Sequence, residues 1–203
     1  MNKILKIIDM ANNVKEYVLE AKDIARHCLP GQFIILRVTE DGERVPFTIC
    51  DYDREKGTIT LLIQEVGYST HVMFGLKEGD SVHDMVGPLG NPTDLDEYEN
   101  VMLVGGGIGC AVIFPQAKLR KSKGLKSEAI LGARTESLLF AEEGFRENCE
   151  NVYIATDDGS KGTKGFVTTV LQNLLDEGKK IDCVLVVGPM IMMKNVCEVT
   201  RPY

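Results

Sequence analysis

At 203 residues the chain is long enough for one large domain or for two domains of about 100 residues each. Its net charge of -7 argues against nucleic acid or an anionic membrane as a partner, because both repel an acidic protein. No apolar run approaches the roughly 20 residues of a membrane span, and the N-terminus lacks the apolar core of a signal peptide. We therefore expect a cytoplasmic protein.

The six cysteines are scattered along the sequence. No two of them form a C-x-x-C pair, so we expect no zinc or iron–sulfur ligation within this chain. Scattered cysteines in a cytoplasmic protein are typical of free, mostly buried thiols rather than of disulfides.

The first part of the chain has the pattern of a small antiparallel β-barrel, with short apolar segments separated by turn-forming pairs such as Asp41-Gly42 and Lys56-Gly57. The expected strands are 4–8, 14–19, 32–38, 44–50, 58–64 and 81–86. One helix is expected at 68–76, where apolar residues recur at helical spacing. Residues 87–92, with the sequence G-P-L-G-N-P, are predicted to form no regular element.

From residue 100 the pattern changes to strands that alternate with helices. The expected strands are 101–104, 127–131, 151–155 and 183–187. The expected helices are 109–122, 136–147, 165–177 and 189–199. Such alternation is typical of a parallel sheet covered on both faces. The predicted fold therefore has two domains, an antiparallel β-barrel in residues 1–99 and an α/β nucleotide-binding domain in residues 100–203.

The stretch from Val101 to Gly109 has the pattern of a buried strand that turns sharply into a helix. Gly105, Gly107 and Gly109 give G-x-G-x-G, with Cys110 at the last glycine position of the dinucleotide fingerprint. Glycine removes the Cβ that would keep a diphosphate away from the backbone, and the amides of the next helix attract the anion. Taken alone, the pattern fits a cofactor site and a tight structural turn equally well.

Two further stretches suit a flavin nucleotide. Gly67-Tyr68-Ser69-Thr70 is a second glycine turn at a helix start, which is either an anion site or a plain helix cap. Residues 44–48 place a cation, a ring and a hydroxyl along one strand. A flavin uses a flat apolar wall, a donor near N5 and a cation for its phosphate, but an ordinary edge strand fits the same residues.

The order of six motifs along the chain resembles that in the ferredoxin–NADP reductase superfamily. The motifs are R-V-P-F-T, G-Y-S-T, G-P-L-G-N-P, V-G-G-G-I-G, T-D-D-G-S and V-G-P-M. The chain is most similar to the electron-transfer subunits of dihydroorotate dehydrogenase and to the small subunit of NADH-dependent ferredoxin:NADP oxidoreductase, or sulfide dehydrogenase. The resemblance spans essentially the whole chain. It implies FAD on the barrel, NAD(P)H on the α/β domain, and a hydride passed from nicotinamide to flavin N5 without a protein acid or base.

The resemblance also implies which residues hold the cofactors, residues 46–48 lying along the isoalloxazine with Thr48 near N5. The FAD residues are Arg44, Pro46, Phe47, Thr48, Gly67, Ser69 and Thr70. The NAD(P)H residues are Gly105, Gly106, Gly107, Gly109, Arg134, Thr156, Asp157, Gly159, Gly188, Pro189 and Met190. Met190 either borders the nicotinamide or packs the last helix on the sheet.

The choice between NADH and NADPH stays open. An acid at the end of the second α/β strand usually selects NADH, and here no acid occurs before Glu136. Arg134 suits a 2′-phosphate, but it also suits an exposed surface position.

Three features of the chain depart from the superfamily pattern. Arg44 stands one residue early, with Val45 at the usual arginine position, and Val187 replaces a cysteine that many reductases have beside the Gly-Pro. The sequence ends where the subfamily typically continues into a [2Fe-2S] segment, so we expect a piece of a longer protein.

In the longer form, the cluster would pass electrons to a larger catalytic flavoprotein subunit of a heterodimer, or to ferredoxin. The alternatives are a non-catalytic nucleotide-binding module and a stand-alone NAD(P)H–flavin reductase.

Overall fold

The computed structural model describes residues 2–11 and 13–203 and divides the chain into two compact units, Met1–Thr93 and Asp94–Tyr203. Residues 94–99, which the sequence pattern assigned to the first domain, belong to the second unit. Arg120 explains this, because its guanidinium donates hydrogen bonds to the carbonyl oxygens of Leu95 and Tyr98 and so ties the segment to the second unit.

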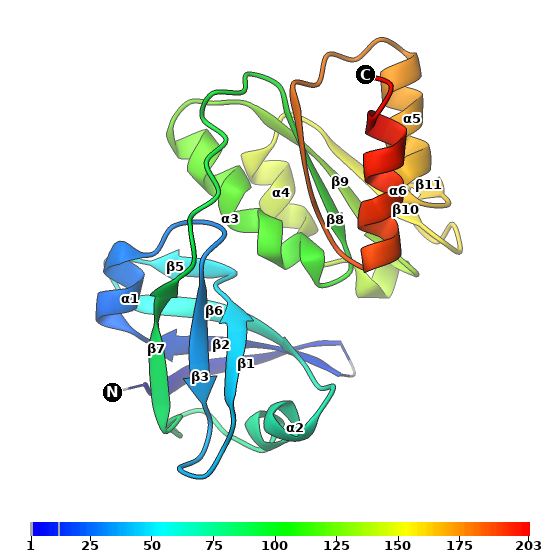
Figure 1. Ribbon diagram of the computed structural model, residues 1–203. Helices are drawn as coiled ribbons and strands as arrows, with labels where there is room; N and C mark the ends of the chain where they lie inside the picture. The colour runs from blue at the N-terminus through cyan, green and yellow to red at the C-terminus, as the bar shows by residue number, and fades with distance from the viewer. Residues whose placement is uncertain (1, 12) are drawn as a thin grey trace. The chain divides into compact units, whose positions relative to one another are not determined.

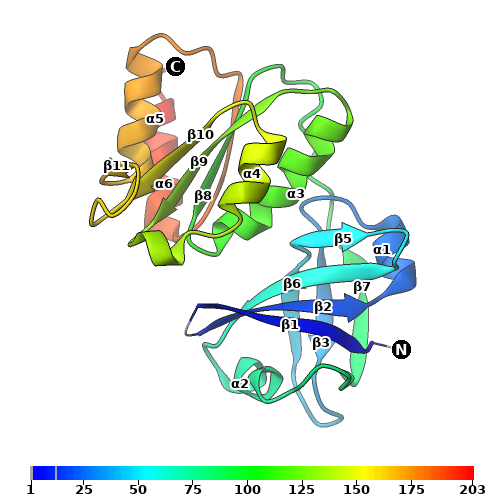
Figure 2. The same ribbon diagram turned by 180° about the vertical axis from the view of Figure 1, so that it is seen from behind.

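The first unit contains two antiparallel sheets, ordered β1-β2-β6-β5 and β4-β3-β7 (Figures 1 and 2). Its strands are β1 (Ile4–Ala11), β2 (Val14–Glu20), β3 (Phe33–Arg37), β4 (Arg44–Thr48), β5 (Asp51–Asp53), β6 (Thr58–Gln64) and β7 (Asp84–Leu89). Its helices are α1 (Lys22–His27) and α2 (Tyr68–Phe74). The antiparallel architecture predicted for this half is confirmed.

Three features of the first unit were not predicted, and strand β5 is one of them. Helix α1 is too short to show a clear period, although it buries Ile24 and Ala25 in the core. Strand β7 extends to Leu89, which pairs with Phe33 of β3, so the prediction of no regular element in residues 87–92 is wrong for 87–89. Pro88 fits there because β7 is an edge strand, where a missing amide donor leaves no neighbour unpaired.

The second unit is an α/β layer structure. Its parallel strands are β8 (Val101–Gly106), β9 (Ser127–Ala133), β10 (Val152–Thr156), β11 (Thr163–Lys164) and β12 (Cys183–Val187), in the order β11-β10-β9-β8-β12. Its helices are α3 (Gly109–Ser122), η1 (Glu136–Leu138), α4 (Glu142–Asn148), α5 (Val167–Asp176) and α6 (Met190–Thr200). Figures 1 and 2 show α3 and α4 on one side of the sheet and α5 and α6 on the other. The predicted parallel sheet covered on both faces is confirmed.

The helix expected over 136–147 is interrupted. Only a short 3₁₀ turn, η1, forms at its start, and α4 begins after Ala141, whose φ of 58° is left-handed. Phe140 lies before the break and Phe145 lies after it, and both side chains are buried. In one continuous helix, residues five positions apart would point in different directions. Across the described ranges, no helix is long and apolar enough to cross a bilayer.

The central strand β8 is buried along its whole length, and its neighbours β9 and β12 pair with it in parallel register. The carboxyl ends of these strands therefore lie at one edge of the sheet, where ligands bind in open α/β sheets. The glycine turn from β8 into α3 lies at this edge.

Candidate functional site

The turn from β8 to α3 consists of glycines because most of its positions have no room for a side chain. A Cβ on Gly105 would lie 2.8 Å from the Sγ of Cys110, and one on Gly109 would lie 2.2 Å from the carbonyl oxygen of Val187. Gly107 differs, because its φ is +55° and a Cβ there would meet nothing within 4 Å. Gly107 is therefore the point where a ligand has room to approach the backbone.

Packing from α6 explains two more of the predicted glycines. A Cβ on Gly106 would lie 2.4 Å from the Sδ of Met192, and one on Gly188 would lie 2.5 Å from its Cε. Met192 therefore fills the space beside the ends of β8 and β12. Pro189 and Met190 start α6, and Met190 is 82% exposed, so it does not pack on the sheet. Its side chain is available at the edge where the strands end.

Cys110, at the last glycine position of the fingerprint, is fully buried. Burial raises the pKa of its thiol to about 12, so the sulfur is neutral at physiological pH and serves as a packing atom. The cysteines of the described chain are all free thiols. Within the described ranges, no three His, Cys, Asp or Glu residues gather as metal ligands.

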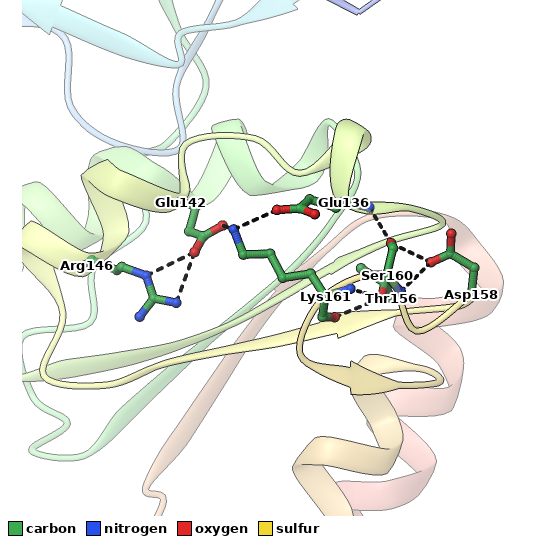
Figure 3. A network of polar contacts seen from close by, with 7 residues as sticks. All are labelled: Glu136, Glu142, Arg146, Thr156, Asp158, Ser160 and Lys161. Atoms are coloured by element: carbon green, nitrogen blue, oxygen red, sulfur yellow. Dashed lines mark hydrogen bonds and ion pairs between the residues drawn. The ribbon is translucent and has the colours of Figure 1, made fainter.

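Lys161 joins the loops that follow β9 and β10, as Figure 3 shows. Its Nζ lies 3.2 Å from Oε1 of Glu136 and 2.9 Å from Oε2 of Glu142, and these hydrogen bonds raise the pKa of Lys161. The Oγ of Ser160 accepts a hydrogen bond from the Glu136 amide at 2.8 Å and donates one to Asp158 at 2.6 Å. The two loops are therefore held together by the protein's own side chains.

The four predicted residues of these loops have different environments. Thr156 is fully buried, and its Oγ1 donates to the Lys161 carbonyl and accepts from the Lys161 amide, so its hydroxyl fixes the loop. Asp157 and Gly159 are exposed on the turn. Arg134 is exposed, and its guanidinium pairs with no residue in the described part of the chain. Arg134, Asp157 and Gly159 are thus open to a ligand, whereas Thr156 is not.

In the first unit, the candidate site is the outward face of the β4-β3-β7 sheet. Ile34 and Leu36 of β3 are fully buried, so residues 33, 35 and 37 face outward. Phe47 pairs with Ile34 and packs against the core. Pro46 and Thr48 lie on the opposite, outward face, so the side chains of residues 46–48 do not all share one face. The Thr48 hydroxyl has no hydrogen-bond partner among residues 2–11 and 13–203.

Arg44 lies on the same outward face and donates from Nη1 to Oδ2 of Asp84 on β7, at 2.8 Å. This hydrogen bond, with a further contribution from the charge of Arg37, lowers the pKa of Asp84. Arg37 of β3 pairs in register with both residues, and its Nε is buried without a hydrogen-bond partner in the described structure. A half-buried guanidinium with no hydrogen-bond partner among the described residues fits an anionic flavin nucleotide.

Arg37 was not among the predicted residues. In the sequence it is separated from Arg44 by the hairpin turn, and only the strand register places the two arginines side by side. A register prediction for the 32–38 and 44–50 strands was the one signal that could have identified it.

The turn before α2 contains the remaining predicted residues. The Thr70 Oγ1 accepts hydrogen bonds from the amides of Val66 and Gly67, both at 3.0 Å, and donates to the Gly67 carbonyl. Thr70 therefore shapes the turn from within. Ser69 is half-buried, and a Cβ on Gly67 would meet nothing within 4 Å. Val66 and Tyr68, neither of which was predicted to bind FAD, are 78% and 77% exposed beside it.

Comparison with known proteins gives consistent matches over both units. The family model described as an oxidoreductase FAD-binding domain matches residues 2–93. A dihydroorotate dehydrogenase B (NAD(+)) electron transfer subunit homolog from Thermotoga maritima is 41% identical over 194 residues, which cover 96% of this chain and 68% of the relative. The corresponding electron transfer subunit of Bacillus cereus is 36% identical over 192 residues, covering 92% of this chain and 72% of the relative.

A solved structure described as an NADH-dependent reduced ferredoxin-NADP oxidoreductase superposes with a TM-score of 0.92 at 39% identity. The superposition covers 99% of this chain and 72% of that chain. The similarity therefore extends over the glycine turn of the second unit as well as the sheets of the first.

Proposed function

The chain belongs to the ferredoxin–NADP reductase superfamily, among the dihydroorotate dehydrogenase B electron-transfer subunits and their homologues, and we propose that it carries electrons between a nicotinamide nucleotide and a partner protein. It is an NAD(P)H-dependent oxidoreductase that binds FAD. The observation that carries the proposal is Gly107, where the backbone is left-handed and an added Cβ would meet nothing within 4 Å.

FAD, when bound, accepts a hydride from a reduced nicotinamide and gives up its electrons one at a time. In the first unit, we propose that Pro46 and Thr48 border the isoalloxazine, with the free Thr48 hydroxyl donating toward N5. Gly67 and Ser69 would receive the diphosphate at the start of α2, where Thr70 already fixes the turn. The support for this arrangement is that Pro46 and Thr48 lie on the outward face and that a Cβ on Gly67 would meet nothing within 4 Å.

In the second unit, we propose that Gly107 receives the nicotinamide nucleotide, with Asp157 and Gly159 alongside and Met190 bordering the nicotinamide. The chain's own residues need only orient this substrate and exclude water, because hydride transfer requires no protein acid or base. The Cys110 thiol, with a pKa of about 12, stays protonated near neutral pH and takes no part in proton transfer.

The onward route of the electrons is the finer part of the proposal. We propose a larger catalytic flavoprotein subunit as the partner in a heterodimer, with ferredoxin as a second acceptor and a [2Fe-2S] cluster in a longer form of the protein. We also propose a cytoplasmic location. The support is that relatives matching over 92% or more of this chain are described as electron transfer subunits.

The visible absorption spectrum of the purified chain, before and after anaerobic addition of NADH or NADPH, tests the proposed function. We expect a flavin spectrum that bleaches with at least one of the two coenzymes. A flavin spectrum that stays unbleached with both would favour a non-catalytic nucleotide-binding module. Steady turnover in which added FAD behaves as a diffusing substrate would favour a stand-alone flavin reductase.

A further inference from the structure

Arg37 stands out in the described structure as a half-buried arginine whose Nε is enclosed and has no hydrogen-bond acceptor. Buried polar groups in native proteins are almost always paired, because an unpaired donor loses its hydration without replacement. A charged guanidinium makes this cost larger. Nε itself is closed to solvent, whereas Nη1 and Nη2 of this half-buried side chain are not and have no hydrogen-bond partner among the described residues, so an acceptor from outside the chain can bind the guanidinium there.

The neighbours of Arg37 determine the charge of that acceptor. Arg44 on one side and Asp84 on the other form an ion pair that reaches across β3, with side chains 50% and 34% exposed. An exposed ion pair of this kind contributes little to stability. Its effect here is to neutralise Asp84, so that the three side chains together carry one positive charge. This local charge favours an anion over a neutral group.

The position of Arg37 relates it to the flavin. Thr48 and Arg44 lie on the same face of β4, four residues apart, which is about 13 Å at roughly 3.3 Å per residue. Arg37 is the register partner of Arg44, so the same distance separates it from the proposed N5 position beside Thr48. A ribityl chain is shorter than this, and the long side chain of Arg37 covers the difference, so the first phosphate of a flavin nucleotide lies within reach of its guanidinium.

We propose that Arg37 binds a phosphate oxygen of FAD, and that Arg44 and Asp84 position it for this contact. This inference rests on the proposed binding of FAD to the outward face of β3, β4 and β7. Arg44, the arginine that the sequence motif suggested for the phosphate, is then a positioning residue, because its Nη1 is already committed to Asp84.

The test measures dissociation constants of FAD, FMN and riboflavin by fluorescence titration of the flavin-free protein. We expect Arg37→Gln to raise the Kd for FAD and FMN at least about tenfold, as for a lost hydrogen bond to a charged group, and to leave the Kd for riboflavin unchanged. Arg26→Gln, which removes an exposed arginine on α1, is the matched control and should leave all three unchanged.

Three results would overturn the inference. They are a wild-type protein that binds riboflavin as tightly as FAD, an Arg37→Gln variant with unchanged affinity for FAD, and an equal loss for all three flavins, which would show that Arg37 acts on the ring or on the whole site and not on the phosphate. A wild-type protein that binds no flavin at all would instead contradict the proposed function itself, so the two failures are distinguishable.

A second pair of variants separates positioning from direct binding. Arg44→Gln leaves the Asp84 carboxylate unpaired beside Arg37, so we expect the Kd for FAD to rise severalfold through repulsion and through a competing Arg37–Asp84 contact. Adding Asp84→Asn in the same chain removes that carboxylate and should restore the Kd to within about twofold of wild type. A double variant as weak as Arg44→Gln alone would show that Arg44 itself binds the phosphate.

Discussion

The guanidinium of Arg120 donates a hydrogen bond from Nη1 to the carbonyl oxygen of Leu95, 2.5 Å away, although Arg120 is only 1% exposed. Its Nε and Nη2 donate to the Lys126 carbonyl, and Nη2 also reaches the carbonyls of Tyr98 and Glu99. All of these acceptors are backbone oxygens. Arg120 thus holds the segment before β8 on the second unit through hydrogen bonds to neutral groups.

Replacing Arg120 with methionine keeps an apolar stem but leaves these buried carbonyls without donors. We expect Arg120→Met to lower the free energy of unfolding of the second unit by about 3 kcal/mol. The control is Arg201→Met, whose exposed ion pair with Glu198 should matter by less than about 0.5 kcal/mol. Urea unfolding followed by circular dichroism measures both variants, and equal midpoints would contradict the role of Arg120.

Arg134 provides a test of coenzyme choice. Unlike Lys161, which is held by two glutamates, Arg134 is exposed and has no carboxylate partner in the described parts of the chain. We expect Arg134→Ser to raise the KM for NADPH about tenfold and to leave the KM for NADH nearly unchanged, because only NADPH carries a 2′-phosphate. Flavin reduction rates at varied coenzyme concentration measure both KM values. The control is Lys180→Ser, which removes one positive charge from the segment before β12. A similar rise for both coenzymes would rule out the phosphate role.

The fold followed from the sequence because its signals are local. Alternating strands and helices after residue 100 predict the parallel sheet, and turn pairs such as Asp41-Gly42 predict the antiparallel hairpins. The helix over 136–147 was misplaced in part because the left-handed residue that interrupts it is Ala141, which carries no turn signature. Helix propensity is a local property of the sequence. It cannot indicate a break at Ala141 that accompanies the burial of Phe140 and Phe145 against distant parts of the chain.

The candidate site was less accessible to sequence reasoning, for a physical reason. A glycine motif does not reveal which of its members the fold requires, and only the contacts separate Gly107 from Gly109. Likewise, a motif at residues 44–48 does not reveal that Phe47 faces the core or that Arg44 is paired with Asp84. These properties depend on strand register and on residues distant in sequence, which a single chain's motifs do not encode.

The contact between Lys161 and Glu142 predicts a pH dependence of stability. Burial acts to raise the pKa of Glu142, but hydrogen bonds from Lys161 and Arg146 outweigh it and leave this pKa below its ordinary 4.5. A lowered carboxyl pKa contributes stability that is complete above the ordinary value and is lost as the pH falls through the folded one. We therefore expect Lys161→Met to be less stable than wild type at pH 7, by a margin that shrinks below about pH 5.

Urea unfolding of wild type and Lys161→Met at pH 7, 5 and 3 measures this margin. Lys164→Met is the control, because Lys164 lies three residues further along, exposed on β11, and forms no ion pair with the residues described. Its difference from wild type should be small and independent of pH. A margin for Lys161→Met that grows on acidification would show that the carboxylate is not stabilised by Lys161.

The cysteines differ in their accessibility to alkylation. Burial raises the pKa of Cys110 and of Cys50 to about 12, and both are enclosed, whereas Cys197 on α6 is exposed. We expect iodoacetamide at pH 8 to modify Cys197 in the native protein and to reach Cys110 only after unfolding, because the thiolate is the reactive form. Peptide mass spectrometry measures this, and native alkylation of Cys110 would contradict its assignment as a packing residue.

Gly107 and Gly109 allow the fold and the ligand site to be tested separately. A Cβ on Gly109 would meet the backbone carbonyl of Val187 at 2.2 Å, so Gly109→Ala must displace α3 from β12. We expect a loss of stability of about 2 kcal/mol or more, seen as a lower unfolding midpoint. Any loss of activity in this variant follows from the damaged packing.

Gly107→Ala places its Cβ in open space and adds only the strain of a left-handed alanine, about 1 kcal/mol. That Cβ would stand where the nicotinamide nucleotide is proposed to approach the backbone. We therefore expect the KM for NAD(P)H to rise at least tenfold while the Kd for FAD, which the first unit binds, stays the same. A Gly107→Ala variant with an unchanged KM would mean that glycine is retained there for its backbone conformation alone, and the turn would lose its role in the proposed function.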